Sequence, residues 1–196
     1  PKPALSPKGA FTVEMWIKPK PQFDARLTPV LVDKKYVAHT DYKWSLTAAD
    51  KGGARRMLVT LGFGGDSETI YSEPFAPGAD WQHVAFTYDG AGAVRFYRNG
   101  APLGGADKPA RGPVAPGKHA LSIGDRVGSN YAGFPGFIDE VRICDGVLEF
   151  RPVSVAFETE RKAWRRMEKA EPVRVLVRNL SKKKKKNLRL RVSVDG

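Results

Sequence analysis

The sequence predicts an all-β protein built as a sandwich of two antiparallel sheets, followed by a short helical linker and a C-terminal β-hairpin. Short segments of alternating apolar and polar residues recur along residues 1–150, with turn residues between them at regular spacing. Glycine (20) and proline (15) are frequent, and residues 1–150 show no sustained helical period. Evenly spaced short strands of this kind are typical of β-sandwiches.

The predicted strands follow from the spacing of apolar residues. Phe11, Val13, Met15 and Ile17 share one face of the first strand, because side chains alternate with period two. Trp16 lies on the opposite, polar face, which indicates that this face is partly covered too. Further strands are expected at residues 30–32, 42–46, 57–63 and 69–71, in a hairpin over residues 82–103, and at residues 120–124 and 137–143, with loops over 104–117 and 125–135.

The strongest local signal in this series is the dipeptide Asn99-Gly100. It ends the alternating segment 94–98. A type I′ turn needs positive φ at both central residues, which Asn and Gly tolerate best. We therefore predict a tight hairpin turn at this point.

The basic charge of the chain is unevenly distributed. Its net charge is +12, but residues 1–150 carry 18 Lys and Arg against 16 Asp and Glu, whereas residues 151–196 carry 15 against 5. The nearly neutral body offers no broad basic surface, so no specific nucleic-acid partner is expected. The five lysines at 182–186 are interpreted as a solvated loop tip, the alternative being non-specific binding of anionic polymers.

Several classes are restricted by what the sequence lacks. No apolar run reaches the ~18 residues of a membrane span, and the single cysteine, Cys144, excludes an intramolecular disulfide and is interpreted as a small core residue. His39, His83 and His119 have no ligand-like spacing and are expected at the surface or at strand edges. The chain begins at Pro1 without methionine, so we interpret it as a piece of a larger protein.

The C-terminal part has a different pattern. Residues 157–170 contain no Gly or Pro and are rich in Glu, Arg, Lys and Ala, which predicts a helix within a linker at 151–172. Residues 173–178 and 188–194 alternate as two strands of a hairpin. Because an isolated hairpin is marginal in water, residues 173–196 are interpreted as the start of a second, truncated β-sandwich.

Three segments together resemble the laminin-G-like, or concanavalin A-like, jelly roll. They are residues 11–17, the segment from Trp81 to Gly100, and Gly136-Phe137-Ile138-Asp139-Glu140-Val141-Arg142-Ile143. The resemblance covers residues ~10–150 and implies two packed antiparallel sheets, one of them concave. It also implies a domain at 1–150 that binds sugars or proteins outside the cell, on a cell surface or in the periplasm.

An enzyme is disfavoured. Glycosidases need two carboxylates that face one bond, and the Glu-x-Asp-x-Glu strand motif of the β-glucanase relatives is not found. Asp139 and Glu140 are adjacent, so on a regular strand they face opposite ways. The resemblance also implies one structural calcium, and Asp139 is the position that matches its carboxylate ligand; the alternative is that Asp139 accepts hydrogen bonds from backbone amides.

Two groups of residues are candidates for a ligand site, because sugars stack on aromatic rings and bind carboxylates, amides and guanidinium groups. One is Tyr42 with Trp44. The other is formed by Asp125, Arg126, Asn130 and Tyr131. Either group could instead be structural, since Tyr42 and Trp44 alternate within a predicted strand.

The leading hypothesis is a non-catalytic, monomeric binding module of a larger secreted or cell-surface protein. Carbohydrate is the expected ligand, at the concave face or rim. The alternative is a structural or protein–protein interaction domain whose partner is another extracellular protein.

Overall fold

The structure is a computed structural model that describes residues 5–21, 23–126, 128, 132–158 and 174–179. The chain divides into two compact units, Pro1–Phe150 and Arg151–Gly196. Among the described residues, no helix has the length and apolarity that crossing a bilayer requires.

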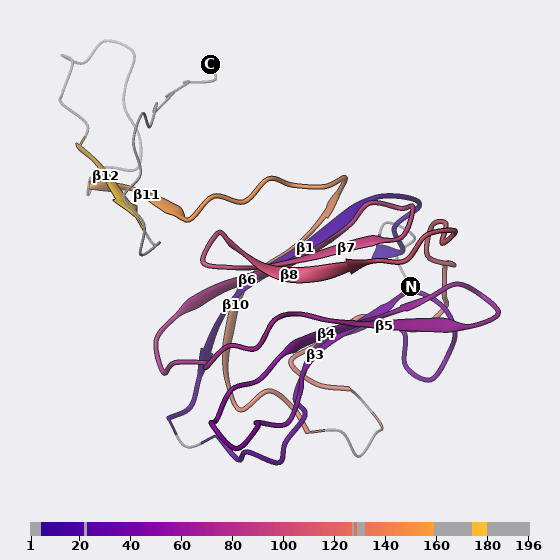
Figure 1. The fold of residues 1–196 in the computed structure, drawn as a ribbon, viewed down its shortest axis with the longest axis horizontal. Coiled ribbons are helices and arrows are strands. Elements are labelled where there is room, and N and C mark those ends of the chain that lie inside the picture. The colour runs from indigo at the N-terminus through magenta and orange to yellow at the C-terminus, as the bar shows by residue number, and fades with distance from the viewer. Residues whose placement is uncertain (1–4, 22, 127, 129–131, 159–173, 180–196) are drawn as a thin grey trace, which may run out of the picture. The chain divides into compact units, whose positions relative to one another are not determined.

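The first unit consists of two five-stranded antiparallel sheets, which Figure 1 shows as two layers. The strand order is β10-β1-β6-β7-β8 in the first sheet and β5-β4-β3-β2-β9 in the second. This arrangement confirms the predicted two-sheet sandwich. The strands are β1 (Phe11–Pro19), β2 (Val30–Asp33), β3 (Tyr42–Leu46), β4 (Met57–Gly62), β5 (Ser67–Tyr71), β6 (Gln82–Tyr88), β7 (Ala93–Arg98), β8 (Ala101–Asp107), β9 (Ser122–Ile123) and β10 (Gly136–Asp145).

The core lies between the two sheets and is built from the inward residues of each alternating strand. The ring of Phe86 on β6 packs edge-on against Phe11 of its own sheet, with centroids 5.7 Å apart, and against Trp44 of the other sheet, at 5.2 Å. All three rings are fully buried. Edge-to-face pairs of this kind stabilise a core beyond the area they bury.

The hairpin predicted at Asn99-Gly100 is confirmed. Asn99 and Gly100 have φ angles of 49° and 71°, and the turn joins β7 to β8. The predicted loop over residues 104–117 begins too early, because β8 continues to Asp107. The strand accommodates this extension through a register shift against β7 between Arg95 and Tyr97.

The chain segment that follows β10 crosses part of the outer face of the first sheet. The Thr12 hydroxyl donates to the Gly146 carbonyl (2.8 Å) and accepts from the Leu148 amide (3.0 Å). The ring of Phe150 then packs against the rings of His83 (5.5 Å) and Tyr97 (4.8 Å). These contacts cover part of the outer face of the first sheet, whereas Arg95 of β7 and Arg142 of β10 stay exposed on it.

One sequence-based assignment on this face is wrong, that of Cys144 to the core, and of the two positions expected for His83, surface or strand edge, the edge does not apply. His83 is not at an edge: it lies on β6, between β1 and β7, with Nε2 2.8 Å from the buried Glu14 carboxylate. That carboxylate also holds Arg142 Nε at 2.9 Å. Cys144 is not in the core, because it pairs with Thr12 on the outer face and is half-buried.

A β-bulge interrupts β10 where a regular strand was expected. The pairing of β1 with β10 shifts register between Glu14 and Trp16, and Glu140 has a φ of 47°. The extra residue resets the alternation. Asp139 and Glu140 are consequently both exposed, rather than facing opposite ways.

In the second unit, β11 (Val153–Glu158) pairs with β12 (Arg174–Asn179) in antiparallel fashion. The helix predicted from residue 157 is wrong at its start, because residues 157 and 158 belong to β11. Its remainder, 159–170, lies outside the described residues. The strand expected at 173–178 is present, but the partner that the structure describes for it is β11. The predicted partner, 188–194, lies outside the described residues.

Replacing Phe86 tests the core. We expect Phe86→Ala to lower the free energy of unfolding by about 3–5 kcal/mol, because the cavity that it leaves adds to the lost burial of the ring. Phe137, which is 62% exposed on β10, provides the control, since an exposed substitution should change stability by no more than about 0.5 kcal/mol. Urea unfolding followed by tryptophan fluorescence measures both, and equal losses would contradict the packing described.

Candidate functional site

A cavity of about 340 Å³ opens where β2 ends, beside β9 at the edge of the second sheet. Three chain segments that are distant in sequence form its walls: the end of β2 with the turn that follows, the approach to β9, and the loop after β9. Its lining residues are Asp33, Tyr36, His119, Ala120, Leu121, Ser122 and Arg126.

Asp33 organises one wall of the cavity through both of its carboxylate oxygens. Oδ1 accepts the backbone amides of Lys35 (2.9 Å) and Tyr36 (2.7 Å), which fixes the turn after β2 as Asp side chains commonly do. Oδ2 lies 3.0 Å from Arg126 Nε in a pair whose side chains are 3% and 7% exposed. One buried carboxylate thus sets both the turn that carries Tyr36 and the position of a guanidinium group.

Aromatic rings complete this arrangement. Arg126 Cζ lies 4.7 Å from the ring centroid of Tyr36, a distance at which a cation and a ring attract. The His119 ring also lies beside Tyr36, with centroids 5.3 Å apart and planes inclined at 47°. Tyr36 is itself half-buried, with a φ of 51°. The cavity therefore combines ring surface with fixed polar groups.

The wall that carries His119 is held by a buried ion pair. Lys34 Nζ lies 2.8 Å from Asp41 Oδ2, and both side chains are almost fully excluded from solvent. The same ammonium donates to the carbonyls of Gly117 (3.4 Å) and His119 (3.3 Å). These contacts join the connection between β2 and β3 to the segment that enters β9.

Gly117 is required where this wall passes the ion pair. A Cβ atom at this position would lie 2.4 Å from Asp41 Oδ2 and 2.4 Å from Thr40 Oγ1. Such distances are far shorter than van der Waals contact. Only a residue without a side chain brings the backbone this close to the pair.

Positive charge gathers beside the cavity. Burial lowers the pKa of the Lys35 ammonium; Asp33 raises it, and the charges of Lys43 and Arg126 lower it further. Lys35 Nζ donates to the Ala38 carbonyl, which compensates part of the cost of burying it. The Asp33 carboxylate pairs with Arg126 and attracts the Lys35 ammonium.

The two sequence-predicted ligand groups have different outcomes. Arg126 lines the cavity, and Asp125 is exposed beside it, with Oδ1 accepting the Arg126 amide at 2.6 Å; a ligand-binding role for these two residues stays a prediction. Asn130 and Tyr131 lie outside the described residues. Tyr42 and Trp44 are both fully buried in the core, so neither presents a ring to a ligand: both point inward from β3.

Six lining residues were not predicted as site residues: Asp33, Tyr36, His119, Ala120, Leu121 and Ser122. Asp33 had a local signal, since it follows an apolar run and precedes turn residues, which is typical of an Asx turn. Its pairing with Arg126 joins residues that are far apart in the chain, and no local signal in the sequence indicated it. His119 was assigned to the surface, where it lies.

Asp139 stands apart from this cavity on the other sheet. Its carboxylate is exposed, and Oδ1 accepts a hydrogen bond from the Glu140 amide at 2.8 Å. This contact fits the alternative given above, in which Asp139 accepts backbone hydrogen bonds instead of binding a metal. Among the described residues, no three His, Cys, Asp or Glu side chains gather in a way that could hold a metal. Calcium at Asp139 stays a prediction that rests on this one side chain.

Comparison with known protein families shows the family to which this chain belongs. A family model described as the concanavalin A-like lectin/glucanases superfamily matches residues 1–153. Comparison with curated proteins gives no match.

Solved structures share the fold at low sequence identity. A native heptameric SAP-like pentraxin from Limulus polyphemus has a TM-score of 0.53 at 19% identity, covering 71% of this chain and 65% of that one. A structure of botulinum neurotoxin type C, whose cell entry depends on interaction with two ganglioside molecules, has a TM-score of 0.52 at 13% identity, covering 74% and 34%. Mouse laminin alpha1 domains LG4-5 score 0.51 at 11% identity, covering 70% and 36%. The chain thus spans less than two thirds of each of these solved chains, and the likeness shows the shared fold.

Removing the Lys34 ammonium tests the buried pair. We expect Lys34→Met to cost about 3–5 kcal/mol of stability, because Asp41 is left as an uncompensated buried charge. The double variant Lys34→Met/Asp41→Asn should recover part of this loss, and urea unfolding of the three proteins measures the coupling. A single variant as stable as the parent would show that the pair contributes nothing to stability.

The calcium prediction has a direct test in thermal unfolding with calcium and with EDTA. A metal bound at Asp139 raises the unfolding midpoint by several degrees, because a ligand stabilises the state that it binds, and Asp139→Ala removes the rise. Equal midpoints in calcium and EDTA would overturn the site and leave Asp139 with its hydrogen bond to Glu140.

Proposed function

Because residues 1–153 place this chain in the concanavalin A-like lectin/glucanase superfamily, we propose that it is a non-catalytic carbohydrate-binding module whose ligand occupies the cavity at Asp33, Tyr36 and Arg126. The superfamily name covers both binding proteins and hydrolases. The chemistry of the cavity favours a binding protein.

The observation that carries the proposal is the ring of Tyr36 beside a buried carboxylate–guanidinium pair. A sugar has an apolar face of C–H groups and a rim of hydroxyls. The ring surfaces of Tyr36 and His119 suit the first, and Asp33, Arg126 and the Ser122 hydroxyl suit the second. A small number of fixed polar groups in an otherwise apolar pocket is the usual design of a small-molecule site.

The same cavity does not favour hydrolysis. Of the described residues that line it, Asp33 is the one with a carboxylate, whereas glycoside hydrolysis uses two. That carboxylate accepts two backbone amides and pairs with Arg126, so it is committed to holding the site. These contacts support a binding role.

The similar structures support the class of ligand and not its position. Botulinum neurotoxin type C interacts with gangliosides, which carry sugar headgroups, and its fold resembles the first unit of this chain. The location expected from the sequence, extracellular, cell-surface or periplasmic, belongs to this proposal. So does membership of a larger multidomain protein.

A glycan array probed with the full 196-residue chain tests the proposal. We expect binding to at least one sugar class, and a loss of at least about tenfold in affinity, or 1.4 kcal/mol, for Tyr36→Ala, because the ring that stacks on the sugar is removed. Titration calorimetry with the sugar identified on the array measures the affinity.

Phe137→Ala is the matched control, since Phe137 is an exposed aromatic on the other sheet. It should bind as the parent does, and circular dichroism establishes that both variants are folded. Two results would contradict the proposal: a chain that binds no printed glycan at millimolar concentration, or Tyr36→Ala binding with unchanged affinity. The first would favour a structural or protein-interaction domain.

A further inference from the structure

The turn between β7 and β8 contains a pair of residues that can react with each other. Asn99 is followed by Gly100. The asparagine amide is among the thermolabile groups of proteins, and a following glycine leaves its own main-chain nitrogen accessible for attack on that amide. The other asparagines precede tyrosine or leucine, whose side chains hinder this attack; they are Asn130, Asn179 and Asn187. The sequence thus sets Asn99 apart as a site of self-modification.

In the folded chain, the Asn99 side chain is hydrogen-bonded to the neighbouring strand. The Asn99 main-chain amide donates to the His83 carbonyl at 2.8 Å, and Asn99 Oδ1 accepts from the His83 amide at 2.9 Å. These two bonds extend the β6–β7 ladder by one residue beyond its last pair, Val84 with Arg98. A side-chain oxygen therefore takes the place of a main-chain carbonyl, and it directs the Asn99 side chain across to β6.

The turn restrains the reacting groups further. Asn99 and Gly100 have φ angles of 49° and 71°, as a type I′ turn requires. Asn99 is half-buried, and Gly100 is buried. The reaction brings Asn99 Cγ onto the Gly100 nitrogen, and water or a base must remove the proton from that nitrogen. The first step needs the side chain to leave His83, and the second needs solvent to reach Gly100. Both therefore need the turn to open.

We propose that Asn99 converts spontaneously to isoaspartate and aspartate, and that its hydrogen bonds to His83 restrict the reaction to moments when this hairpin end is open. The Gly100 nitrogen bonds to Cγ, the Cγ–Nδ2 bond breaks, and ammonia leaves with the proton of the Gly100 amide. Water then opens the resulting cyclic imide. Cleavage of the Cγ–N bond gives aspartate, and cleavage at the main-chain carbonyl gives isoaspartate. Local openings of this kind cost less free energy than global unfolding.

The two products differ in their effect on the first sheet. Aspartate keeps the length of the main chain and a carboxylate oxygen for the His83 amide. Isoaspartate runs the main chain through its own Cβ and Cγ, so one atom is added within a two-residue turn, and the pairing of Arg98 with Ala101 no longer fits it. Because His83 also contacts the Glu14 carboxylate and the Phe150 ring, the change reaches the segment that crosses the outer face.

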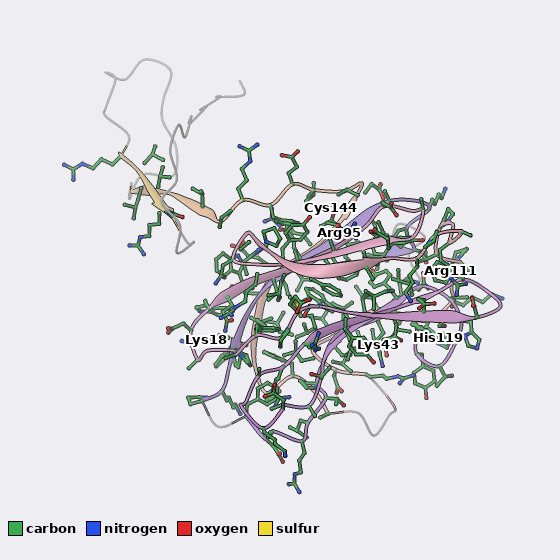
Figure 2. The ribbon with its side chains drawn as sticks, in the orientation of Figure 1. Lys18, Lys43, Arg95, Arg111, His119 and Cys144 are labelled. Carbon is green, nitrogen blue, oxygen red and sulfur yellow. The ribbon has the colours of Figure 1, made fainter. Side chains whose placement is uncertain are left out.

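The reactive turn and the cavity belong to different sheets. Figure 2 shows Arg95, a β7 residue, in the layer of β7 and β8, whereas Lys43 and His119 lie on the β3–β5 layer. The cavity is formed at the edge of the second sheet. The proposal is therefore independent of the carbohydrate proposal, and either can fail without the other.

The experiment follows the two products by mass spectrometry. The full chain is kept at neutral pH, folded or unfolded in urea, and is digested at mildly acidic pH, where the cyclisation is slow. Electron-transfer fragmentation distinguishes isoaspartate from aspartate. We expect both products at Asn99 in both samples, formed at least about tenfold faster in the unfolded chain, equivalent to an opening free energy of about 1.4 kcal/mol. A peptide of residues 95–103, measured with and without urea, corrects for the denaturant.

Two further measurements test the local opening. Ala101→Gly loosens the turn on its β8 side, and it should raise the folded chain's rate at least about twofold, because glycine weakens a strand. Ala91→Gly, at an exposed position before the other end of β7, is the matched control and should keep the parent's rate. Urea well below the unfolding transition should also leave the rate nearly unchanged, since local opening exposes little surface.

Each part of the proposal has a result that overturns it. If Asn99 is unmodified in the unfolded chain, it is not the site. If the folded and unfolded chains react at the same rate, the contacts with His83 do not protect it. A folded rate that rises steeply with low urea assigns the opening to global unfolding, and a folded chain that stays unmodified while the unfolded chain converts completely shows that the turn does not open. Either result contradicts the local mechanism.

Discussion

The ion pair between Lys34 and Asp41 is the contact on which the candidate site depends. Burying two charges is costly, and it is tolerated where the charges meet each other and further polar groups satisfy them. Here Lys34 also donates to the carbonyls of Gly117 and His119, while the Asp41 amide donates to the Ala115 carbonyl at 2.8 Å. The pair thus closes the β2–β3 connection and fastens to it the loop that leads into β9.

The two sheets share a core but have different outer faces. On the first, the chain that leaves β10 returns over the strands and places Phe150 against His83 and Tyr97. On the second, the outer residues are polar and partly exposed, and they lead into the cavity. The two sheets have the same number of strands but different outer faces, because the C-terminal segment of the first unit lies over part of one of them.

The fold was predictable because its signals are local, and the site was less so because its contacts are not. Alternation in Phe11–Ile17 and the positive φ of Asn99-Gly100 follow from the chemistry of adjacent residues. Arg126 was named as a candidate because of the residues in its loop. Its partner Asp33 could not be named, because the two residues come together only when the order of the strands in the sheet is known. Tyr42 and Trp44 were ambiguous because alternation does not say which face of a strand is inward. The bulge at Glu140 was not predicted, because the sequence around it has the same pattern as a regular strand. In the second unit, β12 was predicted. Its pairing with β11 was not, because the residues of β11 were predicted to form a linker and the start of a helix.

The wall of the cavity is fastened chiefly by its backbone, and this has a consequence for how the protein can diversify. Lys34 holds the carbonyl oxygens of Gly117 and His119, and every residue has a carbonyl, so the exposed side chains of His119 and Ala120 can be exchanged while the wall keeps its path. Leu121 differs, because its side chain packs against the core. Gly117 is the exception, because any side chain there would collide with Asp41 and Thr40. Under the proposed function, a lineage of such domains would acquire new ligand preferences through a few substitutions at these positions, with the sandwich beneath them unchanged. Libraries that randomise positions 119 and 120 would, under the same proposal, alter specificity in the laboratory.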